Sequence, residues 1–334
     1  MKAYEIVGEG GIDTLTLNER PDPKPGPGEV LVRMRASSIN YRDLMTVEDP
    51  GPRGIHYPRI PNSDGAGEVL EIGEGVSRFN VGDKVCGTFF QGWIDGPITA
   101  RDMANALGGS AEGMLAERRV LHENGLVAMP EGLSFEEAST LPCAALTAWH
   151  SLVEVGGVKA GDTVLMLGTG GVSVVALQLC KMLGARAVIT SSSEEKLARA
   201  KTLGAWETVN YRTNPDWDKA VLDLTGGLGV DHTVEVGGAG TLEKSITATK
   251  VGGSVGLIGV LTGGQINPTL VMRKSIRLQG IYVGSRRMFE EMNRAIEHHV
   301  MRPVIDKVHD FDDAHAAYHA VRAAGHFGKL VIRI

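Results

Sequence analysis

The stretch VLMLGTGGVS, from Val164 to Ser173, is the strongest constraint on how this chain folds, because an apolar strand runs directly into a glycine-rich turn. The residues that follow, VVALQLCKMLG, favour a helix that ends at Gly184, and a second apolar strand covers Ala187 to Thr190. Strand, turn, helix and strand in this order form a βαβ unit. The sequence therefore predicts a parallel sheet flanked by helices.

The glycine-rich turn has the properties of a dinucleotide-binding turn. Gly168 suits a tight turn after a buried strand, and Gly170 permits close approach of a phosphate. The helix that begins after Gly171 directs unpaired backbone amides at an anion. Ser173 takes the third position of the G-x-G-x-x-G pattern and is small enough to keep helix and sheet close. The predicted pyrophosphate contacts are Gly168, Thr169, Gly170, Gly171 and Val172.

The end of the second strand indicates which dinucleotide is bound. Hydroxyl residues occupy the tip, where NAD-binding proteins of this kind carry an acid for the ribose. The first acids, Glu194 and Glu195, fall where the next helix begins, with Ser193 as its N-cap. Cations follow at Lys196 and Arg212; they suit a 2′-phosphate, and the alternative for both is a solvated surface. The sequence predicts NADPH, bound by Ser191, Ser192, Lys196 and Tyr211.

Length and texture predict two domains. A chain of 334 residues is too long for one typical core. Its first part alternates in short runs such as EVLVRMRASSI, broken by glycine and proline, which is typical of a β-rich domain. Six expected strands of a doubly wound parallel sheet lie near Val164, Ala187, Thr208, His232, Ser254 and Arg277. The predicted domains are 1–125 with 300–334, to which the final KLVIRI strand returns, and 126–299.

Charge and composition exclude several classes of partner. A net charge of −6 and a pI near 6.0 argue against nucleic acid, which needs a basic surface. No segment has the length of a membrane span, and the opening MKAYEIV is already strand-like. The three cysteines are far apart in sequence, which suits reduced thiols. We expect a cytoplasmic protein with a small-molecule substrate, no nucleic acid partner and no membrane contact.

Several motifs, in order and spacing, resemble those of the medium-chain dehydrogenase/reductase superfamily, and of its zinc-independent quinone oxidoreductase-like branch. They are SSINYRDL (37–44), GAGEVLEIGEGVSRFNVGDKV (65–85), LPCAALTAWHSL (141–152), GTGGVS (168–173) and the terminal GKLVIRI. The resemblance covers essentially the whole chain. It implies an α/β homodimer whose subunits hold NADPH between a GroES-like, β-rich catalytic domain and a Rossmann domain with a doubly wound parallel sheet.

The zinc ligands of the alcohol dehydrogenases in that superfamily have few counterparts here. Asn40 to Asp43 stand at the cysteine-histidine position, and Asn62 to Asp64 stand at the G-H-E position. Only Cys143 matches a ligand, and the stretch after Cys86 lacks the four cysteines of a structural zinc site. One thiolate does not hold zinc. We predict no metal.

A metal-free site requires another way to stabilise negative charge as hydride arrives. A quinone or an α,β-unsaturated carbonyl suits such a site, because hydrogen bonds can stabilise the resulting anion. The resemblance places Asn40 and Tyr41 near the nicotinamide, as donors to the substrate oxygen, with ordinary turn structure as the alternative. Asp64 lies where zinc enzymes carry an acid beside the metal ligands, with a structural salt bridge as the alternative. The predicted catalytic residues are Asn40, Tyr41 and Asp64.

Further cofactor contacts follow from the resemblance alone: Thr147, Val236, Leu257, Ile258, Val283, Gly284 and Lys329. The segment from Phe89 to Glu112 is expected to form part of the substrate wall. The predicted function is NADPH-dependent reduction of quinones or enones. Two alternatives stay open: an NADP-dependent alcohol dehydrogenase or carbonyl reductase of the same superfamily, and a dinucleotide-binding protein with little turnover.

Overall fold

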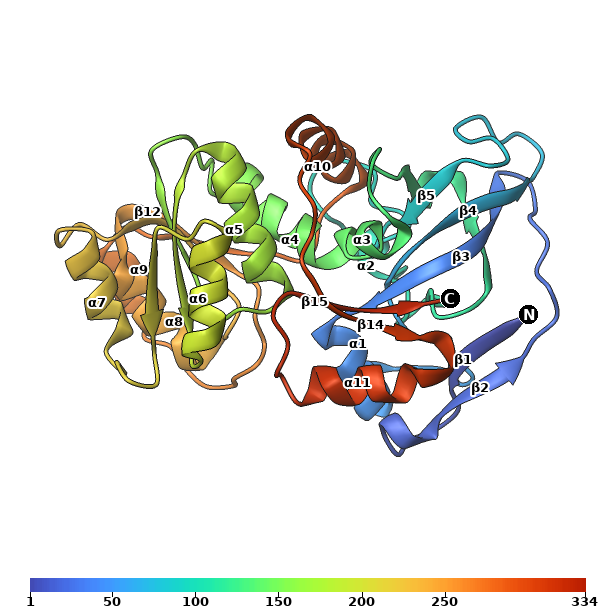
Figure 1. The fold of residues 1–334 in the computed structure, drawn as a ribbon, viewed down its shortest axis with the longest axis horizontal. Helices are drawn as coiled ribbons and strands as arrows, with labels where there is room; N and C mark the ends of the chain where they lie inside the picture. Colours follow the sequence, from blue (N-terminus) through green and yellow to red (C-terminus); the bar gives the residue numbers. More distant parts are fainter. The chain divides into compact units, whose positions relative to one another are not determined.

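The computed structural model describes all residues, 1–334, and divides into two compact units. The first unit contains Met1–Leu146 and Val283–Ile334, and the second contains Thr147–Tyr282. Figure 1 draws the first in blue to cyan with the red C-terminal segment, and the second mainly in green to orange. The predicted α/β fold, with a β-rich unit and a unit built on a parallel sheet, is confirmed.

The unit limits differ from the predicted boundaries of 125/126 and 299/300. Residues 126–146 lie with the first unit because β7 (Leu126–Ala128) pairs with β5 (Lys84–Gly87). Helix α10 (Arg286–His299) also lies there, and Asn293 on its buried face donates to the Ala128 carbonyl at 3.0 Å. A helix after the last strand of a parallel sheet resembles another crossover helix in sequence, so its packing partner was not predictable locally.

The first unit is built on a seven-stranded sheet in the order β14-β15-β3-β4-β5-β7, with β6 pairing to β3. A separate antiparallel hairpin joins β1 and β2. The strands are β1 (Lys2–Ile6), β2 (Leu15–Glu19), β3 (Glu29–Ile39), β4 (Asp64–Ile72), β6 (Arg118–His122), β14 (Ile305–Asp310) and β15 (Lys329–Arg333), besides β5 and β7. The helices are α1 (Tyr41–Glu48), α2 (Ala100–Met103), α3 (Phe135–Ala138), α10 and α11 (Ala314–Arg322).

Strand register in this sheet brings distant parts of the chain together. Leu330 of β15 lies opposite Ile39 of β3, and Ser38 of β3 lies opposite Asp64 of β4. The return of the C-terminal strand to the first domain is thus confirmed. The end of β3 and the starts of β4 and β15 consequently meet at one point. Apolar side chains on β3, including Val30, Val32 and Met34, belong to a hydrophobic core of the first unit.

The second unit is a six-stranded parallel sheet in the order β10-β9-β8-β11-β12-β13. The strands are β8 (Thr163–Met166), β9 (Arg186–Ser191), β10 (Glu207–Asn210), β11 (Val230–Glu235), β12 (Thr249–Leu257) and β13 (Arg277–Gly280). All six lie where the sequence predicted them. The strand order reverses between β8 and β11, and sheets of this kind bind ligands beyond the carboxyl ends of the strands at such a reversal.

Helices cover both faces of this parallel sheet (Figure 1). Helix α5 packs with α6 on one face, and α8 packs with α7 and α9 on the other. Their bounds are α5 (Gly171–Leu183), α6 (Glu194–Leu203), α7 (Trp217–Leu224), α8 (Ala239–Ala248) and α9 (Pro268–Arg273). The short α4 (Leu146–Trp149) and the π-helical η4 (Leu141–Ala145) and η5 (His150–Val155) carry the chain into this unit.

Candidate functional site

The turn between β8 and α5 has the geometry of an anion site. Gly168 has a φ of 69°, a left-handed conformation that favours glycine. A Cβ placed on Gly170 would meet no atom within 4 Å, so the space beside this N-cap is open to a ligand. The first amides of α5, beginning with Gly171 and Val172, have no partner within the helix. The turn can therefore hold a phosphate, as the sequence indicated.

Ser173 explains why this turn tolerates serine at its third position. Its side chain is fully buried, and its hydroxyl donates to the Leu167 carbonyl at 2.6 Å. The bond fastens the first turn of α5 to the end of β8. A hydroxyl with a buried partner costs little in a core, whereas an unpaired one would be destabilising. Serine thus keeps helix and strand as close as glycine does.

The tip of β9 is organised by hydroxyl groups rather than by an acid. Thr190 accepts a hydrogen bond from the Gly168 amide at 3.2 Å, so it supports the glycine turn. Ser191 accepts from the Ser193 amide at 3.3 Å. Ser193 accepts from the Lys196 amide at 3.3 Å and is the N-cap of α6, as the sequence predicted.

The first acid after this tip, Glu194, is engaged by the neighbouring strand β10. Glu194 accepts a hydrogen bond from the side chain of Asn210, at the end of β10. Tyr211 is exposed, and its amide donates to the Ser191 carbonyl at 3.1 Å. The structure therefore brings the predicted Ser191 and Tyr211 side by side at the carboxyl end of the sheet, with Lys196 in the first turn of α6.

Glu235 is a buried acid at the same sheet edge that the sequence analysis missed. Its carboxylate accepts hydrogen bonds from the Gly237 amide at 2.7 Å and the Gly238 amide at 3.0 Å. It also accepts from the hydroxyls of Thr241, at 2.7 Å, and Ser245. This carboxylate holds the turn that contains Val236 and leads into α8. An acid ending a buried strand before two glycines was the available signal.

The remaining residues predicted to contact the cofactor lie at strand ends, in α4 and directly after the second unit. The Ile258 amide donates to the Glu235 carbonyl at 2.9 Å, which joins the ends of β12 and β11. Leu257 is the last residue of β12, and Thr147 is buried in α4. Val283 and Gly284 belong to the first unit, where a Cβ on Gly284 would lie 2.8 Å from Leu146.

A buried polar network occupies the meeting point of β3, β4 and β15 in the first unit. Asn40, directly after β3, accepts a hydrogen bond from the Lys329 ammonium and donates to the Ser63 hydroxyl at 3.3 Å. Lys329 also donates to the Ile39 carbonyl at 2.7 Å, and Ser63 donates to Asp64 at 2.6 Å. The predicted Asn40, Asp64 and Lys329 are thus brought together. Ser63 was not predicted.

Asp64 is the acidic end of this network. It is fully buried and accepts a further hydrogen bond from the Cys143 amide at 3.1 Å. Burial raises the pKa of Asp64, as does nearby Asp43, while Lys329 and hydrogen bonds from Asn40 and Ser63 act in the opposite direction. The partial compensation of a buried carboxylate by a buried ammonium is what makes the pair tolerable.

Arg42 and Asp43 fasten the start of α1 to its surroundings. Asp43 accepts from the Asn40 amide at 2.8 Å and from the Ser63 amide at 3.2 Å. Arg42 donates to the Leu107 carbonyl at 2.5 Å, and its guanidinium lies 4.4 Å from the ring centroid of Phe89. Asp43 therefore fixes the backbone on both sides of the network, and Arg42 holds the segment around Leu107.

Tyr41 lies apart from the buried network. It is the first residue of α1 and is 45% exposed, whereas Asn40 is 9% exposed. His56 is exposed on a loop and is likewise outside the network. Of the two donors predicted from the sequence, Asn40 is the one held by several partners.

The residues at this point do not fit a zinc ion. No three histidine, cysteine, aspartate or glutamate side chains are placed to hold a metal. Asn40 and Ser63 are neutral, and burial raises the pKa of the Cys143 thiol. Both Asp64 oxygens already accept hydrogen bonds, and the Lys329 ammonium places a positive charge nearby. This donor set lacks the thiolate and imidazole ligands that zinc prefers.

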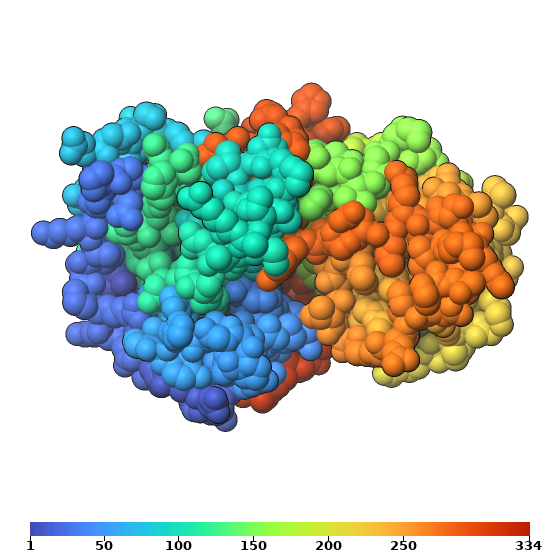
Figure 2. Space-filling view, turned by 180° about the vertical axis from the view of Figure 1, so that it is seen from behind, coloured from blue at the N-terminus to red at the C-terminus, as the bar shows by residue number.

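The segment from Phe89 to Glu112, which the sequence predicts to form part of the substrate wall, is buried near its two ends and exposed in its middle. Phe89, Phe90 and Trp93 are all at most 3% exposed, with the Phe89 and Phe90 ring centroids 4.7 Å apart. These aromatic side chains belong to the core. Figure 2 shows residues near 100, coloured blue-green, at the surface. The exposed part of the segment is its middle, around α2.

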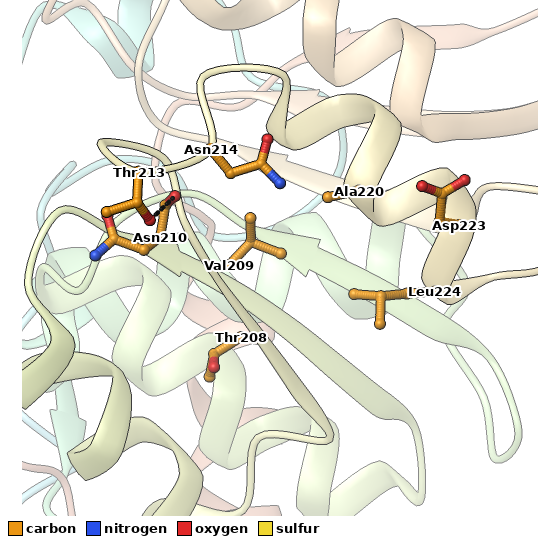
Figure 3. Close-up of a pocket in the computed structure, with 8 residues that line it drawn as sticks. All are labelled: Thr208, Val209, Asn210, Thr213, Asn214, Ala220, Asp223 and Leu224. Carbon is orange, nitrogen blue, oxygen red and sulfur yellow. Dashed lines mark hydrogen bonds between the residues drawn. The ribbon is translucent and has the colours of Figure 1, made fainter.

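A pocket of about 460 Å³ lies between the edge strand β10 and α7. Figure 3 shows Val209, Ala220 and Leu224 directed toward one another across it. Asp223 is its only charged lining residue, and it contains none of the side chains predicted to bind the cofactor's phosphates. We interpret it as a packing groove at the sheet edge.

No helix in the structure is both long and apolar enough to cross a membrane.

Comparison with known proteins supports the fold from both sequence and structure. Residues 26–131 match the alcohol dehydrogenase GroES-like domain, and residues 171–298 match the zinc-binding dehydrogenase family. The chain is 42% identical over 333 residues to a zinc-type alcohol dehydrogenase-like protein of Schizosaccharomyces pombe, covering 97% of this chain and 96% of that protein. It is 32% identical over 249 residues to a quinone oxidoreductase of Pseudomonas aeruginosa, covering 73% and 69% of the two chains.

Solved structures give the same result. A putative alcohol dehydrogenase from Sinorhizobium meliloti superposes with a TM-score of 0.92 at 42% identity, covering 99% of this chain and 98% of that one. A mycobacterial protein complexed with NADPH superposes with a TM-score of 0.84 at 27% identity, and each chain is covered completely. Similarity therefore extends over both units of this chain.

Proposed function

Since the chain belongs to the medium-chain dehydrogenase/reductase superfamily of oxidoreductases, we propose that it reduces quinones or α,β-unsaturated carbonyls with NADPH, by direct hydride transfer and without a metal. The observation that carries this proposal is the network of Asn40, Ser63, Asp64 and Lys329. It places an amide donor and a buried ammonium where a zinc site would need anionic ligands.

In the proposed reaction, bound NADPH supplies the hydride, which adds to a carbon conjugated with the substrate carbonyl. Negative charge then develops on the carbonyl oxygen. Asn40 donates a hydrogen bond to that oxygen through the Nδ2–H directed away from Ser63 and Asp64. Donors already oriented toward developing charge lower the barrier without reorganisation. Solvent then supplies the proton that completes the product.

Assays with three hydride acceptors, each with NADPH and with NADH, test this function. Purified protein is treated with a chelator and assayed against 1,4-benzoquinone, a simple enone and a ketone. We expect turnover of quinone or enone with NADPH at a rate that the chelator does not change. Turnover of the ketone alone, or loss of activity with the chelator, would support a dehydrogenase of the alcohol class. Binding of NADPH without turnover would support a binding protein.

The preference for NADPH is proposed to come from the edge formed by Ser191, Ser192, Lys196 and Tyr211. Support comes from the residues of the β9 tip, where Thr190, Ser191 and Ser192 stand in place of the acid that binds the ribose of NAD. Lys196 lies in the first turn of α6, where its charge and the helix N-terminus would both attract an anion.

Lys196→Ala is expected to raise the KM for NADPH by about tenfold, the equivalent of one charged hydrogen bond, and to leave the KM for NADH nearly unchanged. Steady-state kinetics with both nucleotides measure the two values. Lys201→Ala is the matched control, because Lys201 lies in the last turn of the same helix and pairs with Glu207 at 2.8 Å. Equal changes in both KM values would contradict a role for Lys196 in phosphate recognition.

We further propose that the protein is a homodimer that pairs through β13. This strand is an edge of the parallel sheet, so one side of its backbone has no neighbouring strand. Exposed apolar side chains, including Val260, Leu261 and Met272, lie in the segment 258–276 that leads from β12 to β13. Figure 2 shows the orange residues around 270 on the surface. Edge strands of two copies can pair around a two-fold axis.

Size-exclusion chromatography with light scattering is expected to give twice the chain mass of 35.6 kDa. Met272→Glu, which places a charge on that surface, is expected to shift the mass toward one chain. Leu228→Glu is the control, because Leu228 is equally exposed and lies elsewhere in the second unit. A wild-type mass of one chain, or dissociation by both variants alike, would contradict this interface.

A further inference from the structure

The buried network of the first unit runs in one direction from a cation to a carboxylate. Lys329 Nζ donates to Asn40 Oδ1, Asn40 Nδ2 donates to Ser63 Oγ at 3.3 Å, and Ser63 Oγ donates to Asp64 Oδ1 at 2.6 Å. All four side chains are at most 9% exposed. Water therefore has little access to replace any of these bonds.

The two ends of this chain determine the orientation of everything between them. An ammonium has only donors, so it requires the oxygen of the Asn40 amide and not its nitrogen. An ionised carboxylate has only acceptors, so Ser63 gives its proton to Asp64 and keeps a lone pair for Asn40 Nδ2. If the Asn40 amide were flipped, its nitrogen would face the Lys329 ammonium, where both groups are donors. Its oxygen would face the Ser63 hydroxyl, whose proton is already donated to Asp64.

We propose that Lys329 and Ser63 are positioning residues that hold the Asn40 amide in this one orientation, so that its second Nδ2–H is presented to the substrate oxygen. This inference rests on the proposed function, in which Asn40 is the donor. It assigns Ser63 a role, and it gives Lys329 one besides the expected cofactor contact. The ammonium on Oδ1 also draws electron density from the amide and strengthens its remaining N–H as a donor.

The acceptors of Asn40 Nδ2 within the protein lie together: Ser63 Oγ, at 3.3 Å, is itself 2.6 Å from Asp64 Oδ1, and the Asp64 carboxylate also receives a hydrogen bond from Asn40. The N–H proposed to serve the substrate is the one directed away from this pair, while the Asn40 backbone amide is separately satisfied by Asp43 at 2.8 Å. Without Lys329 the amide can rotate by half a turn and present its oxygen instead. An oxygen facing a developing oxyanion would repel it, so the loss falls on the chemical step.

Side-chain NMR tests the orientation without requiring turnover. In protein labelled with ¹⁵N at asparagine, the Asn40 NH2 signals are assigned by their loss in Asn40→Asp. We expect one slowly exchanging Asn40 amide proton in wild type, and at least tenfold faster exchange in Lys329→Met and Ser63→Ala. Lys329→Arg, which keeps a donor, restores protection. Exchange that is unchanged in both variants would overturn the proposal.

Matched controls separate orientation from general loosening. Ser139→Ala removes a buried hydroxyl that donates to the Glu136 carbonyl at 2.8 Å, and Lys274→Met removes an ammonium that donates only to backbone carbonyls. Neither is expected to change the Asn40 signals. Should Lys329→Met fail to fold because Asp64 loses its counter-charge, the pair Lys329→Met with Asp64→Asn removes both charges together and takes its place.

Kinetics then test the consequence for the reaction. In Ser63→Ala we expect a ten- to hundredfold fall in kcat, an increased primary deuterium isotope effect with 4-deuterated NADPH, and an unchanged KM for NADPH. A fall in NADPH affinity with kcat retained would overturn the positioning role. Wild-type protein without turnover would refute the proposed function, while the NMR result would still decide how the amide is held.

Discussion

Glu235→Ala is expected to lower the free energy of unfolding by roughly 3–5 kcal/mol, because four donors lose a buried acceptor at once. These donors are the amides of Gly237 and Gly238 and the hydroxyls of Thr241 and Ser245. No cation pairs with this carboxylate, so the hydrogen bonds and the start of α8 are what stabilise its charge. Its removal therefore leaves the turn from β11 into α8 without its organising group.

Urea unfolding followed by circular dichroism measures this loss. Glu235→Gln keeps an acceptor of the same shape but adds two N–H donors beside hydroxyls and amides, so we expect an intermediate loss of about 2 kcal/mol. Glu194→Ala is the control, since Glu194 is exposed and makes its bond to Asn210 at the surface. A loss below about 1 kcal/mol for Glu235→Ala would mean that water or a shift of the turn replaces the carboxylate.

His232 is expected to make the stability of the protein depend on pH between about 6.5 and 4. It is fully buried on β11, between the hydroxyls of Ser151 at 2.9 Å and Ser254 at 2.8 Å. Burial, with a smaller contribution from the charge of Arg277, lowers the pKa of His232 from 6.5 to about 4. The folded protein thus holds a neutral imidazole over a range in which the unfolded chain holds a charged one.

Because the unfolded chain binds more protons in this window, its stability relative to the folded state increases as the pH falls. The contribution of His232 is fully present above pH 6.5 and is lost as the pH falls to about 4. A shift of this size corresponds to about 3 kcal/mol. We expect the difference in unfolding free energy between wild type and His232→Gln to shrink by that amount across the window.

Urea titrations at several pH values between 7 and 4 measure this difference directly, since other titrating groups are common to both proteins. His298→Gln, at an exposed histidine near the end of α10, is the control for replacing a histidine outside the core. A difference for His232→Gln that does not change with pH would show that the buried imidazole is charged, or that the unfolded chain does not gain a proton there.

The nucleotide half of this protein was largely predictable because its signals are local. The glycine turn, the Ser193 N-cap and the six strands each depend on residues within a few positions of one another. Glu235 escaped prediction for a different reason. Its four donors lie within ten positions, but nothing in the sequence reveals that the end of β11 is sealed from water.

The network in the other half could be predicted only in part. Asn40 and Lys329 are separated by 289 positions, and only the pairing of β15 with β3 makes them neighbours. The resemblance supplied both residues, but not the bond between them or the part played by Ser63. Tyr41 was given equal weight with Asn40, since a sequence does not show which of two adjacent residues turns inward at the start of a helix.

Arg42 has a consequence for replacing part of the surface of this protein. Arg42 donates to Leu107, near one end of the segment from Phe89 to Glu112, and it lies over the ring of Phe89 at the other end. The rings of Phe89 and Phe90 pack against each other there. Both ends of this segment are therefore fixed to the core, while its middle, around α2, is exposed. Residues 96–104 can therefore be exchanged for the corresponding loops of relatives while the buried residues at both ends of the segment stay unchanged.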